Sequence, residues 1–473
     1  MTKQEAVIKY IEDNYLQFNR LRHDVVSDKL QIRLSGEEAM RLLGERQEYW
    51  REMTKHDINS IVCHCAQECD VNITSREVMT ALQSDLIPDV HPLREYILSL
   101  PPFTPDQPDW IDFVASQVRI KPSPESATDR HKGLSERTSC CQTTTLLDRP
   151  YGAERPMNLT GEANLTVSEA NGLTSNSSQC ERSEADRLWR ACFKKWFVAM
   201  VASWMKDEVV NHQVLVLIGK QGIYKTTWLE HLIPPHLRAY ACKLANSSDL
   251  NKDERLRIAE FGLISLDEID SMNSRELNQL KSIITATDVN ERAAYAYTKE
   301  RRVRLASFCA SGNRRDFLTD ITGNRRWLPF EVESIQSPFT TILPYERMYA
   351  QAWALAQDPF FSYWFDLDEI EVLEQHNQHF RDESNEEQLL DVYFAVPPTD
   401  ATNAKFLTTA EISERLIYYG NIKKPMSLSR LGVLLSQKGF LSVRRGNPSR
   451  RGWIIYERES QEVNSERAIL SKH

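Results

Sequence analysis

A run of five apolar residues that opens directly into a glycine-containing loop most constrains the fold of this chain. The run, Val214–Ile218, has the length and the uninterrupted apolar character of a strand buried on both faces of a parallel sheet. The loop GKQGIYKTT follows without a spacer, and an apolar stretch through Trp228 and Leu229 indicates a helix after it. The order of strand, loop and helix therefore predicts an α/β fold with a parallel sheet at its centre.

The loop has the composition of a P-loop, which binds nucleotide phosphates. Its backbone N–H groups and the start of the following helix can surround phosphate oxygens. Lys225 is placed to reach the β- and γ-phosphates of ATP, and the hydroxyl of Thr226 to bind Mg²⁺. Tyr224 departs from the pattern, because a glycine usually precedes the lysine, and its side chain can crowd the phosphates or require another torsion. The residues predicted to contact the nucleotide are Gly219, Gly222, Ile223, Tyr224, Lys225, Thr226 and Thr227.

A second apolar run, FGLISL, ends in the acidic sequence DEID. Acids at the carboxyl end of a buried parallel strand, beside a phosphate loop, lie where open α/β sheets bind nucleotides. Asp267 is therefore predicted to hold Mg²⁺, and Glu268 to polarise the attacking water. The alternative, a pair of exposed loop acids, is disfavoured by the correctly placed loop before them. Asp270 is either a third acid of the site or a solvated residue at a helix start.

Two polar segments follow in the order that a hydrolytic site needs. The strand-like run LASFCASG ends at Asn313, whose amide can hydrogen-bond the lytic water or the γ-phosphate. In GNRRW, Arg325 or Arg326 can stabilise the phosphate that is transferred. That phosphate can belong to the same subunit or to a neighbouring one. The predicted catalytic residues are Glu268, Asn313, Arg325 and Arg326.

Together these motifs resemble the virulence-associated E family of mobile-element and prophage ATPases, in the form found in Bacteroides-type bacteria. The resemblance is carried by GKQGIYKTTWLEHLIP, LISLDEID and SGNRRDFLTDITGNRRWLPFEV. It implies an α/β P-loop NTPase similar to superfamily 3 helicases of the AAA+ class, with flanking helices and with ATP and Mg²⁺ as cofactors. It also implies a homo-oligomeric ring, for example a hexamer, with Asn313 as the sensor and Arg325 or Arg326 as the arginine finger.

Two arginine-rich segments are candidates for DNA contact in a chain whose net charge is −9. The first, residues 292–304, alternates cations with Tyr295 and Tyr297, so it can pair with phosphates and stack on bases. The resemblance also places a DNA-contacting loop there, and a solvated basic hairpin is the alternative. The second segment joins two C-terminal strands. The alternative to DNA contact is that its arginines contact another subunit or only solvent. The predicted contact residues are Arg292, Lys299, Arg301, Arg302, Arg444, Arg445, Arg450 and Arg451.

The composition divides the chain into six segments. The expected segments are an N-terminal mixed α/β or helical domain (1–120), a Ser/Thr-rich flexible linker or insertion (121–183), the ATPase core (184–335), a helical connector (336–400), a winged-helix-like domain (401–460) and a tail (461–473). The linker is predicted because its few large apolar residues cannot offset the entropy of ordering. The C-terminal domain is predicted from two helices followed by a hairpin with a basic tip.

Cys63, Cys65 and Cys69 lie close together beside His64, but the spacing C-H-C-x-x-x-C lacks a second pair, which favours ordinary reduced thiols over a metal site. No apolar run reaches the length of a bilayer span, and the start lacks the apolar core of a signal peptide. We therefore expect a cytoplasmic protein that does not contact a membrane.

These observations predict an ATP-hydrolysing, nucleic-acid-dependent motor of helicase type. Its substrate would be single-stranded or forked DNA during replication of a mobile element or prophage, with element-encoded replication proteins as further partners. One alternative is an ATP-driven regulatory or phage-sensing switch that does not unwind DNA. The other is a non-catalytic DNA-binding replication factor, in which Tyr224 permits nucleotide binding without hydrolysis.

Overall fold

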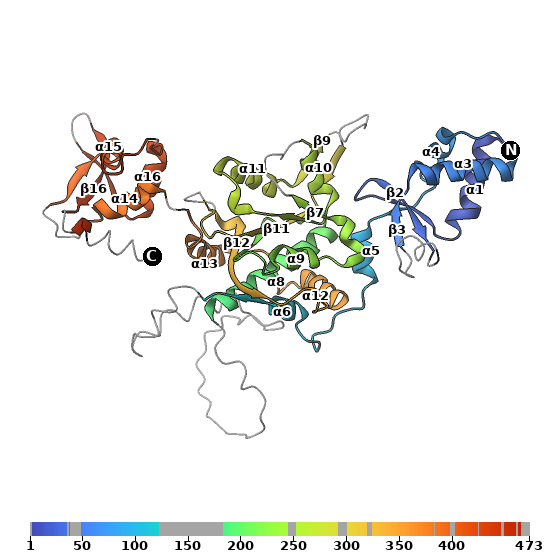
Figure 1. Ribbon diagram of the computed structural model, residues 1–473, viewed down its shortest axis with the longest axis horizontal. Helices are drawn as coiled ribbons and strands as arrows, with labels where there is room; N and C mark the ends of the chain where they lie inside the picture. Colours follow the sequence, from blue (N-terminus) through green and yellow to red (C-terminus); the bar gives the residue numbers. More distant parts are fainter. Residues whose placement is uncertain are drawn as a thin grey trace, which may run out of the picture. The chain divides into compact units, whose positions relative to one another are not determined.

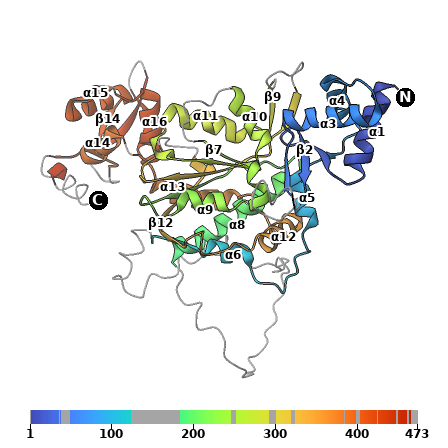
Figure 2. The same cartoon turned by 45° about the vertical axis from the view of Figure 1, so that its right-hand side comes forward.

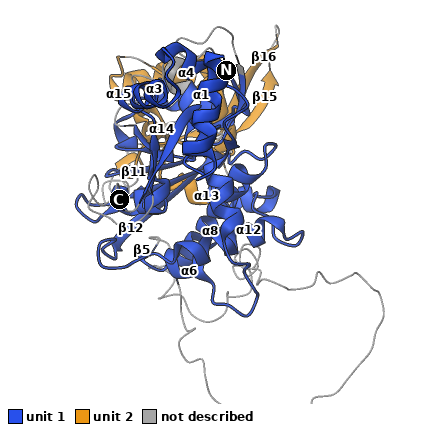
Figure 3. Ribbon diagram, turned by 90° about the vertical axis from the view of Figure 1, so that its right-hand side faces the viewer, with its two compact units in different colours: residues 1–314, 325–375 blue, residues 315–324, 376–473 orange. Residues whose placement is uncertain are grey.

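The computed structural model describes most of the chain outside the predicted linker. Figures 1 and 2 show it in two views, and Figure 3 colours its two compact units, residues 1–314 with 325–375 and residues 315–324 with 376–473. The described residues are 2–35, 37, 49–122, 183–244, 252–291, 300–318, 324–382, 384–397, 403–423, 425–445, 449–459 and 462–464. Residues 123–182 of the predicted linker lie outside them.

A six-stranded sheet forms the centre of the first unit, with strand order β5-β12-β6-β11-β8-β7. Its strands are β5 (Val118–Ile120), β6 (Val214–Ile218), β7 (Ala241–Leu244), β8 (Leu263–Leu266), β11 (Ser307–Gly312) and β12 (Trp327–Ile335). All neighbours pair in parallel except β5, which is antiparallel to β12. Every residue of β6, β8 and β11 is buried, as the continuous apolar runs predicted. The mixed α/β fold with a parallel sheet is thus confirmed.

Helices cover both faces of this sheet. In Figures 1 and 2, α10 and α11 lie on one side, and α6, α8 and α12 lie on the other. The helices are α5 (Pro92–Ser99), α6 (Trp110–Ala115), α8 (Glu184–Met205), α9 (Lys225–His231), α10 (Lys252–Glu260), α11 (Ser274–Thr285), α12 (Tyr345–Gln357) and α13 (Leu367–Gln378). Short 3₁₀ helices occur at Pro235–Tyr240, Ile269–Ser271 and Asn324–Arg326.

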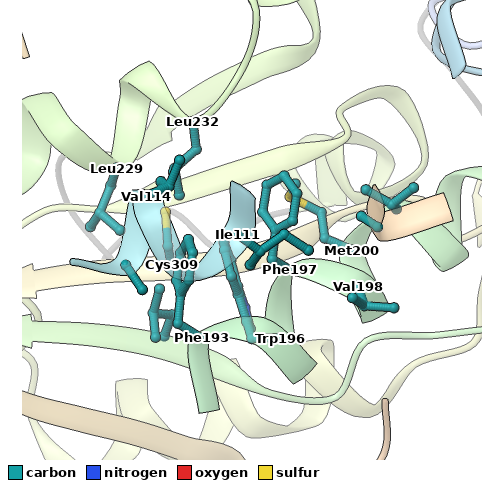
Figure 4. Packing of buried hydrophobic residues seen from close by; sticks show 14 of the residues in the cluster. Ile111, Val114, Phe193, Trp196, Phe197, Val198, Met200, Leu229, Leu232 and Cys309 are labelled. Atoms are coloured by element: carbon teal, nitrogen blue, oxygen red, sulfur yellow. The ribbon is translucent and has the colours of Figure 1, made fainter. Parts of the chain in front are cut away.

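The long helix α8 anchors the core through its aromatic face. Trp189, Trp196 and Trp204 are fully buried, and each donates its indole N–H to a backbone carbonyl at 3.0–3.1 Å. Figure 4 shows side chains of α6, α8, α9 and β11 gathered in the same cluster. This face of α8 therefore packs on the sheet. Because truncating a buried tryptophan costs about 3–5 kcal/mol, α8 fixes the sheet firmly.

The N-terminal segment is a smaller α/β region with its own apolar cluster. Its sheet has the order β3-β2-β1-β4, with β1 antiparallel to β2 and parallel to β4. Its elements are α1 (Lys3–Ile11), a π-helix (Glu12–Leu16), β1 (Leu21–Asp24), β2 (Lys29–Leu34), β3 (Tyr49–Glu52), α3 (Lys55–Cys69), α4 (Ser75–Leu82) and β4 (Asp89–Val90).

The second unit contains three described helices, the last two of which precede a hairpin at the positions that the sequence indicates. Strand β16 pairs antiparallel with β13, β14 and β15, and the helices pack on it around a core that includes Trp453 and Leu434. The elements are α14 (Asn385–Tyr393), β13 (Phe394–Ala395), β14 (Lys405–Leu407), α15 (Thr409–Gly420), α16 (Leu428–Gln437), β15 (Leu441–Arg445) and β16 (Arg450–Glu457). A capping box between Thr408 and Glu411 begins α15.

The cysteine cluster lies on α3, where Cys63 is exposed and Cys65 is buried. Within the ranges that the structure describes, no three or more His, Cys, Asp or Glu side chains are grouped to hold a metal ion. Nor is any described helix both long enough and apolar enough to cross a bilayer.

Candidate active site

The loop of residues 219–224 connects the carboxyl end of β6 to α9. Gly219 has no room for a side chain, because a Cβ there would lie 2.8 Å from the carbonyl oxygen of Val332. Gly222 has φ +85°, and Tyr224 has φ +67° as the N-cap of α9. The tyrosine therefore takes a torsion that glycine adopts freely and that costs other residues about 1–2 kcal/mol. Its ring packs edge-on against Phe339, with 6.2 Å between ring centroids.

Lys225, the first residue of α9, points back into this loop. Its Nζ donates to the carbonyl oxygens of Gly219 at 2.8 Å and Lys220 at 2.7 Å, and to Oδ1 of Asn313 at 3.2 Å. Burial lowers the pKa of Lys225, while the nearby charges of Asp270 and Asp267 oppose that shift. The ammonium is thus held inside the loop, with carbonyl oxygens as its partners.

Asp267 follows β8 and faces the hydroxyl of Thr226 on α9. Its Oδ1 accepts hydrogen bonds from Ser311 Oγ at 2.7 Å and Thr226 Oγ1 at 3.2 Å, and the two hydroxyl oxygens are 2.9 Å apart. Its Oδ2 pairs with Lys243 Nζ at 2.7 Å. Burial by itself raises the pKa of Asp267, but the bonds from Lys243 and Ser311 outweigh it and lower the pKa below its ordinary value. Asp267 is therefore a carboxylate in this site.

Ser311 is not among the predicted site residues, although the sequence contains a signal for it. Side chains two residues apart in a strand point to the same side, so Ser311 shares the side of Asn313. The three oxygen donors Thr226, Asp267 and Ser311 converge within 3.2 Å of one another. Hard oxygen ligands suit Mg²⁺, which commonly uses one or two carboxylates together with substrate phosphates and water. The residues present therefore fit a magnesium–nucleotide site.

The acids after Asp267 differ in environment. Glu268 is exposed with φ +53°, and no other described residue hydrogen-bonds or ion-pairs with its carboxylate. Asp270 is partly buried; its Oδ2 accepts from the backbone N–H of Arg314 at 3.1 Å. Its enclosed Oδ1 has no hydrogen-bond partner among the described atoms. Asp270 is thus part of the site rather than a solvated residue at a helix start.

Arg325 and Arg326 lie at the amino ends of the parallel strands, whereas the loop 219–224 lies at their carboxyl ends. They immediately precede β12, which is parallel to β6, with Trp327 beside Val214 and Glu331 beside Ile218. At about 3.3 Å per residue, the five paired residues separate the two ends of these strands by about 16 Å. The structure therefore does not bring either arginine to Lys225 of the same chain. Both line a cavity of about 520 Å³ together with His212, Gln213, Tyr363 and Trp364.

Within the first predicted DNA-contacting segment, the structure describes β10 (Glu300–Val303), which pairs antiparallel with the preceding strand β9 (Asp288–Glu291). Arg292 and Lys299 lie outside the described residues. Arg301 pairs with Asp288 across the hairpin. Arg302 pairs with Asp28 at 2.7 Å and with Glu260 at 3.7 Å, and its side chain is only 18% exposed.

The second segment forms the hairpin β15–β16, and its arginines face one another. Arg444 lies opposite Arg451, and Arg445 lies opposite Arg450. All four are exposed, and among the residues that the structure describes none of them forms an ion pair within 4.0 Å. Arg451 instead donates to Ser442 Oγ at 3.0 Å, and Arg445 lies 6.0 Å from the ring centre of Phe406. The hairpin thus presents a concentrated positive charge.

Comparison with known proteins identifies the part of the chain that contains the loop and the acids. Residues 164–388 match the virulence-associated protein E-like domain. No curated protein matches the chain. Among solved structures, it is similar to the apo structure of the NrS-1 C terminal region (305-718), with 10% identity over 96% of this chain and 99% of that one and a TM-score of 0.40. The A form apo structure of that region gives 10% identity, the same coverage and a TM-score of 0.39. The central part of this chain, residues 164–388, is therefore similar to the virulence-associated protein E-like domain.

Proposed function

We propose that the chain is a magnesium-dependent ATPase that acts on DNA as a helicase-like motor in the replication of a mobile element or prophage. The proposal rests on one observation above all, the convergence of side chains at the carboxyl ends of β6, β8 and β11. These side chains are Lys225, Thr226, Asp267, Ser311 and Asn313. Ligands of open α/β sheets bind at that edge, and a cation, a carboxylate and hydroxyls are what a magnesium–nucleotide needs.

Each residue has a defined task in the proposed reaction. Lys225 exchanges its loop carbonyls for the β- and γ-phosphate oxygens and stabilises their charge. Thr226 and Asp267 would hold the metal, which when bound would neutralise charge at these phosphates. Glu268, whose carboxylate is exposed, accepts the proton of the attacking water. Asn313, already bonded to Lys225, orients that water beside the γ-phosphate.

The position of Arg325 and Arg326 supports an assembly of more than one copy. Because both arginines lie at the amino ends of the strands, away from Lys225 of their own chain, in this proposal they reach the nucleotide site of a neighbouring chain. The proposed assembly is therefore a homo-oligomeric ring in which one copy supplies an arginine to the nucleotide of the next.

DNA contact in this proposal falls mainly to the second unit. Helices α15 and α16 with the β15–β16 hairpin fit a winged-helix-like domain. The four arginines of the hairpin supply the positive charge that phosphates attract.

The test is ATP hydrolysis by the full chain, with and without single-stranded DNA. We expect stimulation by DNA that Lys225→Ala and Glu268→Gln abolish, with Glu268→Gln still binding nucleotide. Lys220→Ala is the matched control, because this exposed side chain belongs to the same loop but forms no part of the proposed site. Hydrolysis that is indifferent to DNA would instead favour an ATP-driven switch. If no hydrolysis occurs under any condition, the proposal is wrong.

A further inference from the structure

The acidic side of the candidate site already contains a cation, the ammonium group of Lys243. This residue lies on β7, which pairs in parallel with β8, the strand that leads to Asp267. Its Nζ is 2.7 Å from Asp267 Oδ2 and 3.9 Å from Oε1 of Glu230 on α9. The hydrogen bond to Asp267, and after it the charges of Glu230 and Glu268, raise the pKa of Lys243 against the effect of burial. The carboxylates of Asp267 after β8 and of Glu230 on α9 thus both lie within 4.0 Å of one positive charge.

The two oxygens of Asp267 have different partners. Oδ1 faces the hydroxyls of Thr226 and Ser311, where the metal is expected, whereas Oδ2 is bonded to Lys243. A metal that binds Oδ1 therefore shares its ligand with an ammonium group on the other oxygen. The repulsion between two positive charges this close disfavours simultaneous occupation.

The Lys243 side chain can leave its position without a large penalty. It is 45% exposed, and that of Asp267 is 29% exposed, so the pair is not sealed from water. A released ammonium group would be solvated, and Glu230, itself 43% exposed, offers another partner.

We propose that Lys243 acts as a built-in counter-cation, which holds Asp267 in the metal-free state and must leave when Mg²⁺ binds. Lys243 is thus a positioning residue: by pairing with Asp267 it lowers the affinity of the site for Mg²⁺. It thereby sets the Mg²⁺ concentration that nucleotide binding needs. The inference rests on the proposed function for its biological meaning. The affinity of the acidic cluster for a divalent cation can nevertheless be measured without nucleotide.

The experiment compares the full wild-type chain with Lys243→Met and Lys243→Arg. Free Mn²⁺ is followed by electron paramagnetic resonance as the protein is titrated with Mn²⁺ alone. We expect Lys243→Met to tighten Mn²⁺ binding about 5-fold, since it removes a unit charge beside the ligand, and Lys243→Arg to stay near wild type. Lys29→Met is the matched control, because Lys29 forms a similarly exposed pair with Glu52 away from the site. Unchanged or weaker binding of Mn²⁺ by Lys243→Met would overturn the proposal.

A second titration separates this inference from the proposed function. A fluorescent ATP analogue is bound at fixed concentration while MgCl₂ is increased. The half-saturating Mg²⁺ concentration should fall in Lys243→Met by the same factor as for Mn²⁺. If wild type binds no nucleotide at any Mg²⁺ concentration, the proposed function fails, while the Mn²⁺ titration still decides the role of Lys243. Circular dichroism on heating checks that all variants are folded.

Discussion

Two antiparallel hairpins of this chain carry arginines that the sequence marks alike for DNA contact, but the two differ in the partners of those arginines. On β9–β10, Arg301 and Arg302 each pair with acids. On β15–β16, Arg444 and Arg445 instead lie opposite two further arginines. In β9–β10 the positive charges of the two described arginines are compensated by acids of the protein. In β15–β16 the positive charges of the four arginines are presented to solvent.

The two hairpins thus differ in the partners of their basic residues. Like charges directly opposite on a hairpin destabilise it, whereas opposite charges stabilise it slightly. The β15–β16 hairpin therefore retains an unfavourable arrangement that an anionic ligand would relieve. In the β9–β10 hairpin, a DNA phosphate would have to compete with Asp28 and Glu260 for Arg302. We infer that the second hairpin is the stronger DNA-binding surface.

Removal of the four arginines of β15–β16 should have the largest effect. With Arg444, Arg445, Arg450 and Arg451 all replaced by alanine, we expect the affinity for DNA to fall about 100-fold or more at low salt. For single-stranded DNA, the magnitude of the slope of log affinity against log salt should decrease by about 3, since each arginine neutralises about one phosphate. Fluorescence anisotropy of labelled single-stranded DNA at several salt concentrations measures both.

The same variant has a second readout on the folded chain. Its free energy of unfolding should stay equal or rise slightly, because the repulsion across the hairpin is removed. If the affinity were unchanged while Arg301→Ala with Arg302→Ala lowered it, the comparison between the hairpins would be reversed.

The local elements of the fold were predictable because their signals lie in short stretches. Five consecutive apolar residues at Val214–Ile218 leave little alternative to a buried strand, and the loop after it needs Gly219 and Gly222 for space and torsion. The proximity of Thr226 and Asp267 was also predictable, since the carboxyl ends of parallel strands meet at one edge of a sheet.

The remaining features depend on tertiary contacts that no local pattern encodes. Asp28 lies 274 positions from Arg302, so the sequence could not show that this arginine is already paired. Lys243 contacts Asp267 only because β7 and β8 are neighbours. The end of the sheet at which Arg325 and Arg326 lie follows from β12 being parallel to β6, a pairing that the local sequence of β12 does not reveal.

Replacement of Arg302 should change stability more than DNA binding. Arg302→Ala should lower the free energy of unfolding by about 1 kcal/mol, a modest value because its acid partners are partly exposed. The affinity for DNA should stay within about 2-fold, since this guanidinium is committed to carboxylates. Urea unfolding and DNA anisotropy on the same preparation measure the two effects.

The destabilisation by Arg302→Ala should depend on pH. Burial raises the pKa of Glu260 above its ordinary value, and the charge of Arg302 opposes that shift. A raised folded-state pKa means that ionisation of Glu260 disfavours the fold, so stability from this group falls as pH rises through its ordinary pKa. Without Arg302 this loss is larger. The difference between wild type and variant should therefore be greater at pH 7 than at about pH 4, where Glu260 is largely protonated in both states. A difference that does not vary with pH would show that Glu260 is not the relevant partner.

The smallest expected effect is also the most direct test of why the hairpins differ. Asp28→Asn combined with Asp288→Asn removes a carboxylate partner from each described arginine of β9–β10 but leaves the arginines in place. The hairpin then resembles β15–β16, with positive charge available to phosphates. We expect the affinity for DNA to rise about 2–3-fold at low salt, and the gain to vanish at high salt, because solvent-exposed charges are screened. Lys29→Met with Glu52→Gln is the control, since it removes another exposed pair of the N-terminal sheet without changing the net charge. If the double aspartate variant binds DNA no better than this control, compensation by acids is not what distinguishes the two hairpins, and the position of each hairpin in the molecule must be the cause instead.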